Sequence, residues 1–231
     1  MAVIPTVTVT STGARLLSLR RMLSTTATTA SSSLSSLCYL KQGYYPLQRR
    51  RILPARKLVI RAARTESKGV SLGFRAPNFE LTEPLTGKVW KLDDFEPYPA
   101  LLVMFICNHC PFVIHLKKDI VKLSNFYMKK GLAVVGISSN SVVTHPQSQE
   151  VAKDFGAVCT PEFFLFKKDG RRPFELVYHG QFDDSRPSNN APVTGRDLSL
   201  AIDCVLSGQP VSSNQKPSIG CSIKWHPGAK Q

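Results

Sequence analysis

The sequence predicts a mixed α/β domain that follows a basic, disordered leader and precedes an irregular tail. Two continuous apolar runs, 99–106 and 132–138, flank a segment whose apolar residues recur at helical spacing. Each run is long enough for a strand buried on both faces and too short for most helices. Strand, helix and strand of these lengths form a βαβ unit with parallel strands. We therefore assign 1–65 to the leader, 66–208 to the domain and 209–231 to the tail.

The leader accounts for most of the positive charge. The chain carries a formal net charge of +14, yet residues 1–65 contain no acidic residue and the first is Glu66. The remainder is nearly neutral, which argues against a nucleic-acid partner. No stretch approaches the roughly 18 apolar residues of a membrane span, so none is expected.

A leader rich in Ser, Thr and Arg and free of acids is typical of an organelle transit peptide. Its uncharged opening favours the chloroplast, and "VIRAA" (59–63) is similar to a stromal cleavage site, with the cut near Ala62. We expect the mature protein in the stroma, with the mitochondrion as the alternative destination. The other interpretation is a disordered basic tail that binds an acidic partner.

In the first half of the domain, a hairpin precedes the strand 99–106 and a helix follows it. Alternating apolar and polar residues over 76–95 predict a β-hairpin with Gly87 in its turn. The apolar run 99–106 follows as a strand. A helix is predicted next, ending at Gly131, before the second strand. Its inner stripe consists of Val113, Leu116, Ile120, Leu123 and Tyr127.

The second half contains a short helix, a hairpin and a final helix. Pro146 can open the short helix and Gly156 can close it. A second hairpin turns at Gly170. Thr194 and Asp197 stand at capping-box spacing before the final helix. From Gln209 onward, Pro, Ser and Gly predict irregular structure.

Cys107 and Cys110 are the candidate reactive residues of the sequence. Four interpretations apply: a metal clip, a structural disulfide, a nucleophile with a helper, or a redox dithiol. A zinc site needs a second cysteine pair or a histidine pair at ligand spacing, and the sequence has neither. Copper stays open because two thiols and a distant histidine can bind it. A structural disulfide is not expected in a reducing stroma.

The position of the cysteine pair favours a redox-active dithiol. Cys107 closes a predicted strand and Cys110 falls in the first turn of a helix, where free N–H groups and the helix dipole favour a thiolate. A protonated His109 would stabilise that thiolate further. Cys159 is expected to be a small buried filler or, alternatively, a third redox thiol beside the site, and Cys221 a solvated tail thiol or a disulfide partner. The segment "DDSR" (183–186) is expected to be a solvated loop or the rim of a cleft.

The order of these elements resembles the thioredoxin fold, and the hairpin at 76–95 resembles that of its alkyl-hydroperoxide-reductase and thiol-specific-antioxidant (AhpC/TSA) branch. Within that branch, "MFICNHCPF", "CTPEFFLF", "GQFDDSRP" and "QKPSIGCSIKW" are similar to a group of thioredoxin-like oxidoreductases of bacteria and plastids. The resemblance implies that Cys107 is the attacking thiol and Cys110 the resolving thiol. It also implies a cis-proline loop, Thr160-Pro161, whose backbone pairs with the substrate. It implies no cofactor and no metal.

Three departures shape the expected function. The strand before Cys107 has no carboxylate, so His109 or water must carry protons. Peroxiredoxins place Thr or Ser where this chain has Met104. The connector before Thr160 is shorter than in the group it resembles. We expect a thiol–disulfide oxidoreductase with an antioxidant role, whose partners are a protein or small-molecule disulfide and a thiol electron donor. The alternatives are a thiol-dependent peroxidase, a copper-binding chaperone and a redox-inactive interaction module.

Overall fold

The computed structural model describes residues 7–8, 64–140 and 147–226. Most of the leader lies outside these ranges, so the predicted transit peptide and its boundary stay predictions. Four short strands, Val7–Thr8, Arg64–Glu66, Cys159–Thr160 and Ile219–Ser222, were not predicted, and Val7–Thr8 lies in the leader that the sequence predicts to be disordered. The predicted hairpins, strands and helices occur in their predicted order among the elements of the described ranges. They are β1 (Val7–Thr8), β2 (Arg64–Glu66), β3 (Glu80–Thr82), β4 (Val89–Lys91), the 3-10 helix η1 (Leu92–Phe95), β5 (Ala100–Phe105), α1 (Pro111–Met128), β6 (Leu132–Ile137), α2 (Gln147–Asp154), β7 (Cys159–Thr160), β8 (Glu162–Lys167), β9 (Glu175–Gly180), α3 (Arg196–Leu206) and β10 (Ile219–Ser222).

The central sheet has the strand order β1-β6-β5-β8-β9. The two apolar runs of the sequence form β5 and β6, which pair in parallel, because α1 crosses between them. Strand β8 pairs antiparallel with β5, and β9 pairs antiparallel with β8. This arrangement is a thioredoxin-like fold. It brings the end of β5, the start of α1 and the start of β8 to one edge of the sheet.

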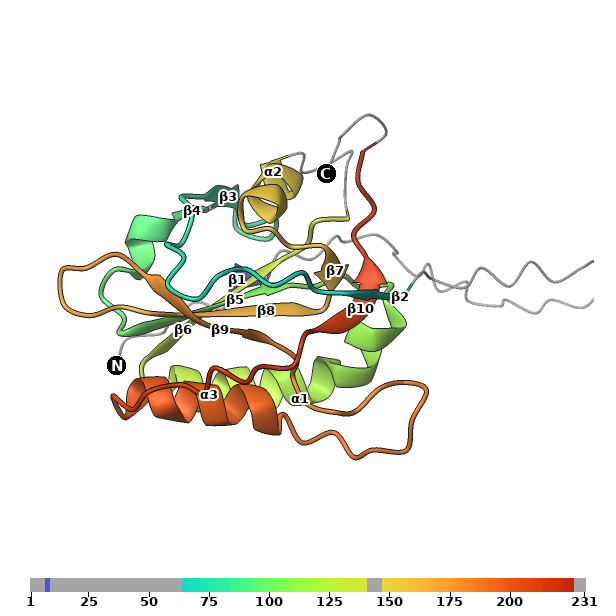
Figure 1. Cartoon of the computed structure of the whole chain (residues 1–231). Coiled ribbons are helices and arrows are strands. Elements are labelled where there is room, and N and C mark those ends of the chain that lie inside the picture. The colour runs from blue at the N-terminus through green and yellow to red at the C-terminus, as the bar shows by residue number, and fades with distance from the viewer. Residues whose placement is uncertain (1–6, 9–63, 141–146, 227–231) are drawn as a thin grey trace, which may run out of the picture. The chain divides into compact units, whose positions relative to one another are not determined.

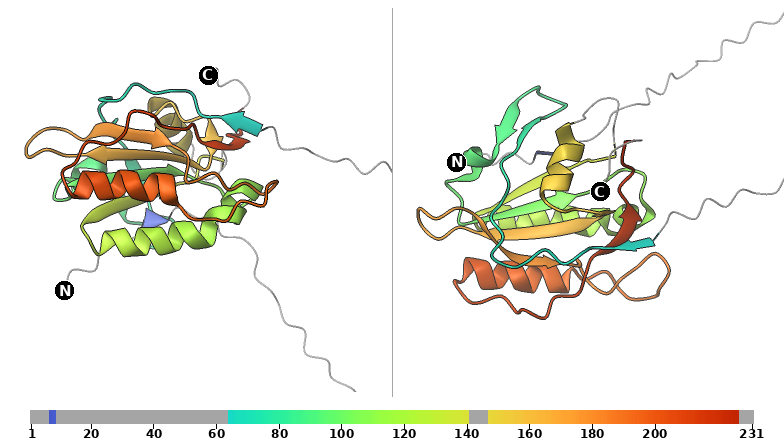
Figure 2. Two further views of the ribbon diagram at one scale, coloured as in Figure 1. Left: turned by 60° about the horizontal axis from the view of Figure 1, so that its bottom comes forward. Right: turned by 45° about the horizontal axis from the view of Figure 1, so that its top comes forward.

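Both faces of the central sheet are covered, as Figures 1 and 2 show: α1 and α3 lie on one face, and α2 with the β3–β4 hairpin on the other. The position of strand β5 between two covered faces explains why its sequence is uniformly apolar. Leu101, Val103 and Phe105 point into the core on the α2 side, whereas Leu102 and Met104 point into the core under α1 and α3. Because successive side chains alternate between faces, a strand covered on both sides needs apolar residues throughout.

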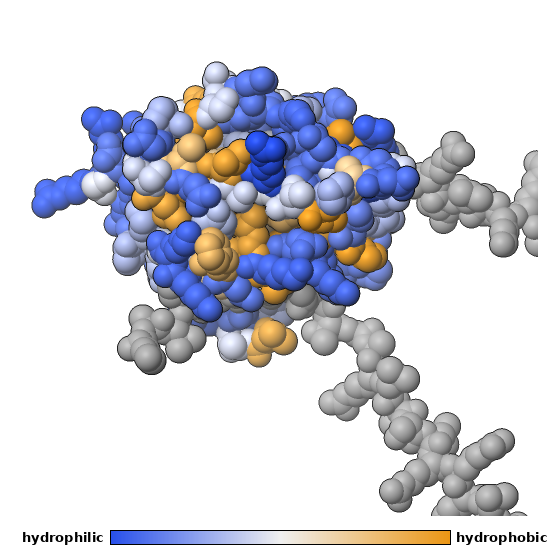
Figure 3. Space-filling view, turned by 90° about the horizontal axis from the view of Figure 1, so that it is seen from below, coloured by the Kyte–Doolittle hydropathy of each residue, from blue (hydrophilic) through white to orange (hydrophobic). Residues whose placement is uncertain are grey.

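The outer surface of α1 and α3 keeps several apolar side chains in contact with solvent. Figure 3 views this side of the molecule, where hydrophobic residues stand among hydrophilic ones. The exposed apolar residues of the two helices are Ile114, Val121, Phe126 and Leu200. Isolated apolar residues of this kind are common on protein surfaces.

The C-terminal region differs from its prediction. The sequence predicts irregular structure from Gln209 onward, whereas Ile219–Ser222 forms β10. Strand β10 joins β2 and β7 in a second, antiparallel sheet of order β2-β10-β7. The strand was hidden from sequence patterns because it is only four residues long and is held by partners that are distant along the chain.

The connector between β6 and β7 is short, and its described part contains the helix α2. Residues 141–146 lie outside the described ranges, so the predicted opening of α2 at Pro146 is outside them as well. The helix covers the sheet with Val151 and Ala152, and Phe155 follows directly after it. Phe155 meets the rings of Phe105, Phe164 and Phe166 edge-on. A single helix therefore covers this part of the sheet.

Helix α3 begins differently from the sequence expectation. The sequence places a capping box at Thr194 and Asp197, whereas the N-cap residue is Gly195, with φ of 63° and no side-chain cap of its own. The carboxylate of Asp183, from the loop after β9, accepts hydrogen bonds from the backbone N–H of Thr194 at 2.6 Å and of Gly195 at 2.7 Å. A distant carboxylate thus satisfies N–H groups that the local sequence leaves without partners.

Candidate active site

Cys107 and Cys110 lie at the junction of β5 and α1. Cys107 is the second residue after β5, and Cys110 is the N-cap of α1, with φ of −75° and ψ of 124°. Pro111 then opens the helix, where its missing N–H costs nothing. Both thiols are almost entirely shielded from solvent, with 6% and 3% of each residue exposed. The pair is therefore buried at a helix start.

A side-chain hydrogen bond between Cys107 and Cys110 shifts the pKa values of both thiols. A hydrogen bond from the Cys107 thiol lowers the pKa of Cys110 to about 7, against the opposing effect of burial. The backbone N–H of Val113 at the start of the helix acts in the same direction as that bond. The same bond to Cys110, together with burial, raises the pKa of Cys107. Of the two thiols, Cys110 is therefore the one that ionises more readily.

His109 lies beside the pair along the chain, but its side chain is exposed. Its interaction with the Cys107 sulfur comes from its backbone, which lowers the pKa of Cys107 against the larger effects of Cys110 and burial. The sequence interpretation gives this role to a protonated imidazole. The structure instead assigns thiolate stabilisation to backbone groups and to the partner thiol.

The Thr160-Pro161 loop faces the cysteines, and its peptide bond is cis. The Thr160 hydroxyl lies 3.4 Å from the Cys107 sulfur. The Cys110 thiol donates to the Thr160 carbonyl oxygen at 3.0 Å. The fold thus brings together Cys107, Cys110, Thr160 and Pro161, four of the five residues that the sequence assigns to the site.

The backbone of Thr160 is paired with another strand of the same chain. Strand β10 pairs with β7, with Cys221 opposite Thr160 and Ser222 opposite Cys159. The two strands approach so closely at Gly220 that a Cβ atom there would lie 2.1 Å from the Thr160 carbonyl oxygen. The resemblance assigns this stretch of backbone to a substrate polypeptide. In this structure β10 of the same chain occupies it.

Cys221 is a site residue that the sequence analysis leaves open as a solvated thiol or a disulfide partner. It is 8% exposed and packs with Cys107, Cys110 and Val113. The Cys110 thiol lies 2.8 Å from the Cys221 sulfur. The signal available in the sequence was the glycine before Cys221, which permits a close backbone approach. A third thiol therefore belongs to the site.

A buried contact between a glutamate and a histidine supports the cis-proline loop. Glu162, which directly follows Pro161, is fully buried, and one of its oxygens lies 2.7 Å from His179 Nε2. The other oxygen accepts hydrogen bonds from the backbone N–H of Val158 at 2.8 Å and of Cys159 at 3.0 Å. These bonds fix both sides of the cis-proline. The carboxylate that β5 lacks thus stands on the neighbouring strand, opposite Phe105.

Cys159 is close to these groups but lacks the properties of a redox thiol. It is fully buried. Burial, followed by the negative charge of Glu162, strongly raises the pKa of Cys159. A thiol that resists ionisation is a poor nucleophile. Cys159 therefore fills space, the first of the two roles that the sequence analysis considers.

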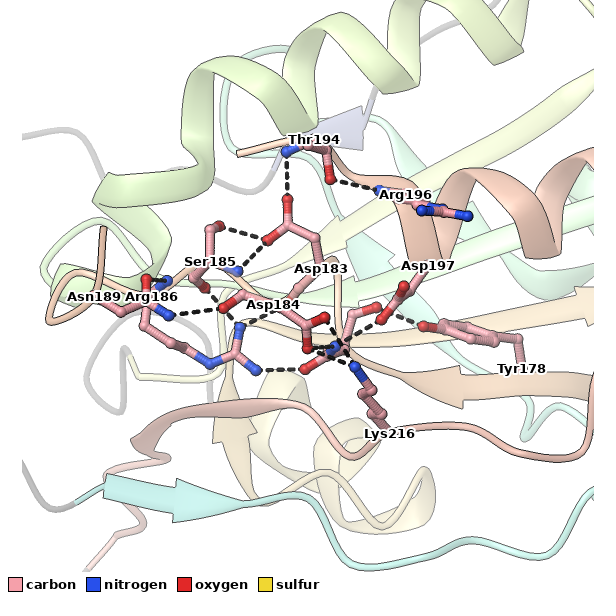
Figure 4. A network of polar contacts seen from close by, with 11 residues as sticks. Tyr178, Asp183, Asp184, Ser185, Arg186, Asn189, Thr194, Arg196, Asp197 and Lys216 are labelled. Atoms are coloured by element: carbon pink, nitrogen blue, oxygen red, sulfur yellow. Dashed lines mark hydrogen bonds and ion pairs between the residues drawn. The ribbon is translucent and has the colours of Figure 1, made fainter. Parts of the chain in front are cut away.

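The loop after β9 borders the site on one side. A small hollow beside Pro161 is lined by residues that include Phe112, Phe182 and Arg186. Figure 4 shows how the loop is held: the Arg186 guanidinium donates to the carbonyl oxygens of Asp183 and Ser185, both at 2.6 Å, and to the side chain of Gln181. The segment "DDSR" therefore rims a hollow, one of its two predicted roles.

The described ranges, 7–8, 64–140 and 147–226, contain neither a candidate metal site nor a candidate membrane span. In these ranges no group of three or more His, Cys, Asp or Glu side chains is arranged to hold a metal ion. No helix among them is long and apolar enough to cross a membrane.

Comparisons with known proteins define the class of the molecule. Residues 72–150 match the AhpC/TSA family. A crystal structure of a hypothetical protein from Sinorhizobium meliloti is 43% identical, with a TM-score of 0.65, and the match covers 71% of this chain and 100% of that one. A crystal structure of an uncharacterized conserved protein from Geobacillus kaustophilus is also 43% identical, with a TM-score of 0.67, covering 72% and 98%. No curated protein matches the chain.

Proposed function

We propose that this protein is a thiol–disulfide oxidoreductase whose working group is the Cys107–Cys110 dithiol. The observation that carries the proposal is the position of the pair: two buried thiols stand together at a helix start, and the pKa of Cys110 is lowered to about 7. A thiolate is the nucleophile in disulfide exchange, so a pair that ionises near neutral pH is suited to it. The AhpC/TSA family match supports thiol-based redox chemistry.

The first step uses Cys107 as the nucleophile. Cys107 passes its proton to Cys110 and attacks one sulfur of a substrate disulfide, which breaks the S–S bond and forms a mixed disulfide. The departing thiolate takes a proton from water. The Thr160 hydroxyl, 3.4 Å from the Cys107 sulfur, is placed to donate to that sulfur as negative charge develops.

The second step uses Cys110. Cys110 loses its proton to water and attacks the Cys107 sulfur, so that the mixed disulfide breaks and the second product thiol leaves. The substrate has gained two electrons and the protein holds a Cys107–Cys110 disulfide. A thiol electron donor then reduces that disulfide. The substrate is a protein or a small-molecule disulfide.

Two substitutions test this assignment. Cys107→Ser should reduce the exchange rate with a model disulfide to that measured without protein, because the attacking thiol is gone. Cys110→Ser should accumulate the mixed disulfide, because the resolving thiol is lost, and should form it more slowly, because Cys110 no longer accepts the proton of Cys107. Cys204→Ser on α3 is the matched control and should exchange at the wild-type rate. Wild-type exchange by Cys107→Ser would overturn the assignment.

The pH dependence provides a second readout. Because the pKa of Cys110 is lowered to about 7, the exchange rate of the wild-type protein should rise with pH through about 7. An unperturbed cysteine, with a pKa of about 8.5, would place this rise higher. An exchange rate that rises at a pH of about 8.5 would contradict the lowered pKa of Cys110.

A thiol-dependent peroxidase is the second candidate, because the AhpC/TSA family match favours it. The position three residues before Cys107 carries Met104, which is buried in the core on the α1 side and offers no hydroxyl to orient a peroxide. We therefore expect hydrogen peroxide turnover to be slow relative to disulfide exchange. Stopped-flow measurement of both rates on one preparation distinguishes the two functions.

A further inference from the structure

Strand β10 lies against the cis-proline loop as a substrate strand would. It pairs with β7 at Thr160, and Figure 1 shows β10 between β2 and β7 near the start of α1. Gly220 makes this approach possible, since any side chain at that position would collide with the Thr160 backbone. The strand that occupies this position presents a cysteine.

The cysteine that β10 presents meets the dithiol directly. The sulfurs of Cys110 and Cys221 are 2.8 Å apart, although the two residues are 111 positions apart in the chain. Both are buried, so solvent does not separate them. Cys110 therefore has two thiol neighbours: Cys107, which forms a side-chain hydrogen bond with it, and Cys221.

From this geometry we propose that Cys221 is a third redox thiol, which takes over the disulfide from the Cys107–Cys110 pair. The Cys221 thiolate attacks the Cys110 sulfur of the Cys107–Cys110 disulfide. The Cys110–Cys221 bond forms, the Cys107–Cys110 bond breaks, and Cys107 leaves as a thiolate that receives the proton given up by Cys221. No electrons enter or leave the protein in this step. The proposal rests on the proposed function for the origin of the first disulfide.

The exchange changes what the oxidised protein presents at its site. Before it, both members of the dithiol are consumed. After the exchange, Cys107 is a free thiol again, and the disulfide joins Cys110 to Cys221 of β10. The reducing partner then acts on a disulfide anchored to the C-terminal strand.

Disulfide mapping tests the proposal. Fully reduced wild-type protein is oxidised with glutathione disulfide, quenched with acid, alkylated and digested without reduction. We expect a peptide pair linked through Cys110 and Cys221, with Cys107 alkylated. Cys221→Ser should lose this pair and retain the Cys107–Cys110 disulfide, whereas Cys159→Ser should keep the wild-type pattern. Alkylated Cys221 in all wild-type samples, with Cys107–Cys110 as the final disulfide, would overturn the proposal.

A second arm separates this proposal from the proposed function. Cys107→Ser protein cannot form the first disulfide, but diamide oxidises neighbouring thiols directly. We expect diamide to link Cys110 to Cys221 in this variant, and to leave them unlinked in the double variant that also carries Cys221→Ser. If wild-type protein fails to react with glutathione disulfide while the variant forms this link, the oxidoreductase function fails and the thiol pairing stands. If the variant forms no link, the pairing itself is refuted.

Discussion

Asp183 shows how one residue can hold two elements together. Its carboxylate accepts hydrogen bonds from the backbone of Ser185 at 2.9 Å and from Thr194 and Gly195 before α3. Burial raises the pKa of this carboxyl, but the hydrogen bonds outweigh burial, and the pKa of Asp183 is lowered overall. The loop that rims the site and the start of α3 therefore depend on a single charge.

We predict that Asp183→Asn lowers the free energy of unfolding by roughly 2 kcal/mol at pH 7, the scale of hydrogen bonds to a charged group. Because the folded-state pKa is depressed, the stabilisation is fully present above the unfolded pKa of about 3.9 and is lost as the pH falls through the folded pKa. The difference between wild type and variant should shrink on acidification below pH of about 4. Denaturant unfolding at neutral and acidic pH measures it.

Asp184→Asn is the matched control for this prediction. Asp184 is the neighbouring residue, and its ion pair with Lys216 at 2.8 Å is exposed to solvent. Solvent and salt screen such a pair, so its loss should matter little. Equal destabilisation by the two substitutions would show that the buried hydrogen bonds of Asp183 carry no special weight.

At the residue scale, the sequence predicted what local context determines. Cys107 and Cys110 were identifiable because they are neighbours along the chain, at a strand end and a helix start. The roles of Glu162 and Asp183 were not identifiable, and that of Cys221 stayed open between two alternatives, because each acts through a partner brought near by the fold: His179, the backbone before α3, and Cys110. A single glutamate, aspartate or cysteine in a sequence does not indicate which distant residue it will contact in the fold.

Strand β10 shows the same limit for elements. The apolar runs of β5 and β6 and the helical spacing of α1 identified those elements in advance, because burial on a sheet or helix imposes a period. The four residues of β10 have no period to read. The strand exists because β2 and β7 supply its hydrogen bonds and because Gly220 lets it reach Thr160.

We predict that Gly220→Ala displaces β10 and separates Cys221 from Cys110. The new Cβ would lie 2.1 Å from a backbone oxygen, so the strand must move. Forced contacts in a packed interior typically cost about 1–3 kcal/mol. The variant should have a lower melting temperature, and Cys221 of the reduced protein should be alkylated faster than in wild type. Calorimetry and mass spectrometry of the alkylated protein give the two readouts.

Gly69→Ala is the control for Gly220→Ala. Nothing lies within 4 Å of the position that its Cβ would take. The melting temperature and the alkylation rate of Cys221 should both stay close to the wild-type values. If Gly220→Ala behaves in the same way as Gly69→Ala, the close approach of β10 to Thr160 is not what positions Cys221.

At the scale of the whole molecule, charge separates two parts of the chain. Residues 1–65 contain no acidic residue, and the remainder is nearly neutral. The cleavage position suggested by "VIRAA" lies just before β2, which begins at Arg64. A cut there would leave β2 available to pair with β10.

We propose that residues 1–65 direct import into chloroplasts. A fluorescent protein fused to this segment should accumulate inside chloroplasts, and N-terminal sequencing of the processed full-length chain should start near Ala63. A fusion to residues 66–231 should remain outside, since it lacks the basic, acid-free segment. Accumulation in mitochondria alone would refute the plastid assignment and retain an import function.

The contact between Cys110 and Cys221 also bears on chain entropy. A bond there would close a loop of 111 residues, which by loop-closure arguments removes about 5 kcal/mol of conformational freedom from the unfolded chain, whereas a Cys107–Cys110 bond removes only about 2 kcal/mol. Passing the disulfide from the short loop to the long one would therefore raise the resistance of the whole domain to heat. By the same linkage, the folded domain would hold the long-range bond against reduction, and unfolding would release it.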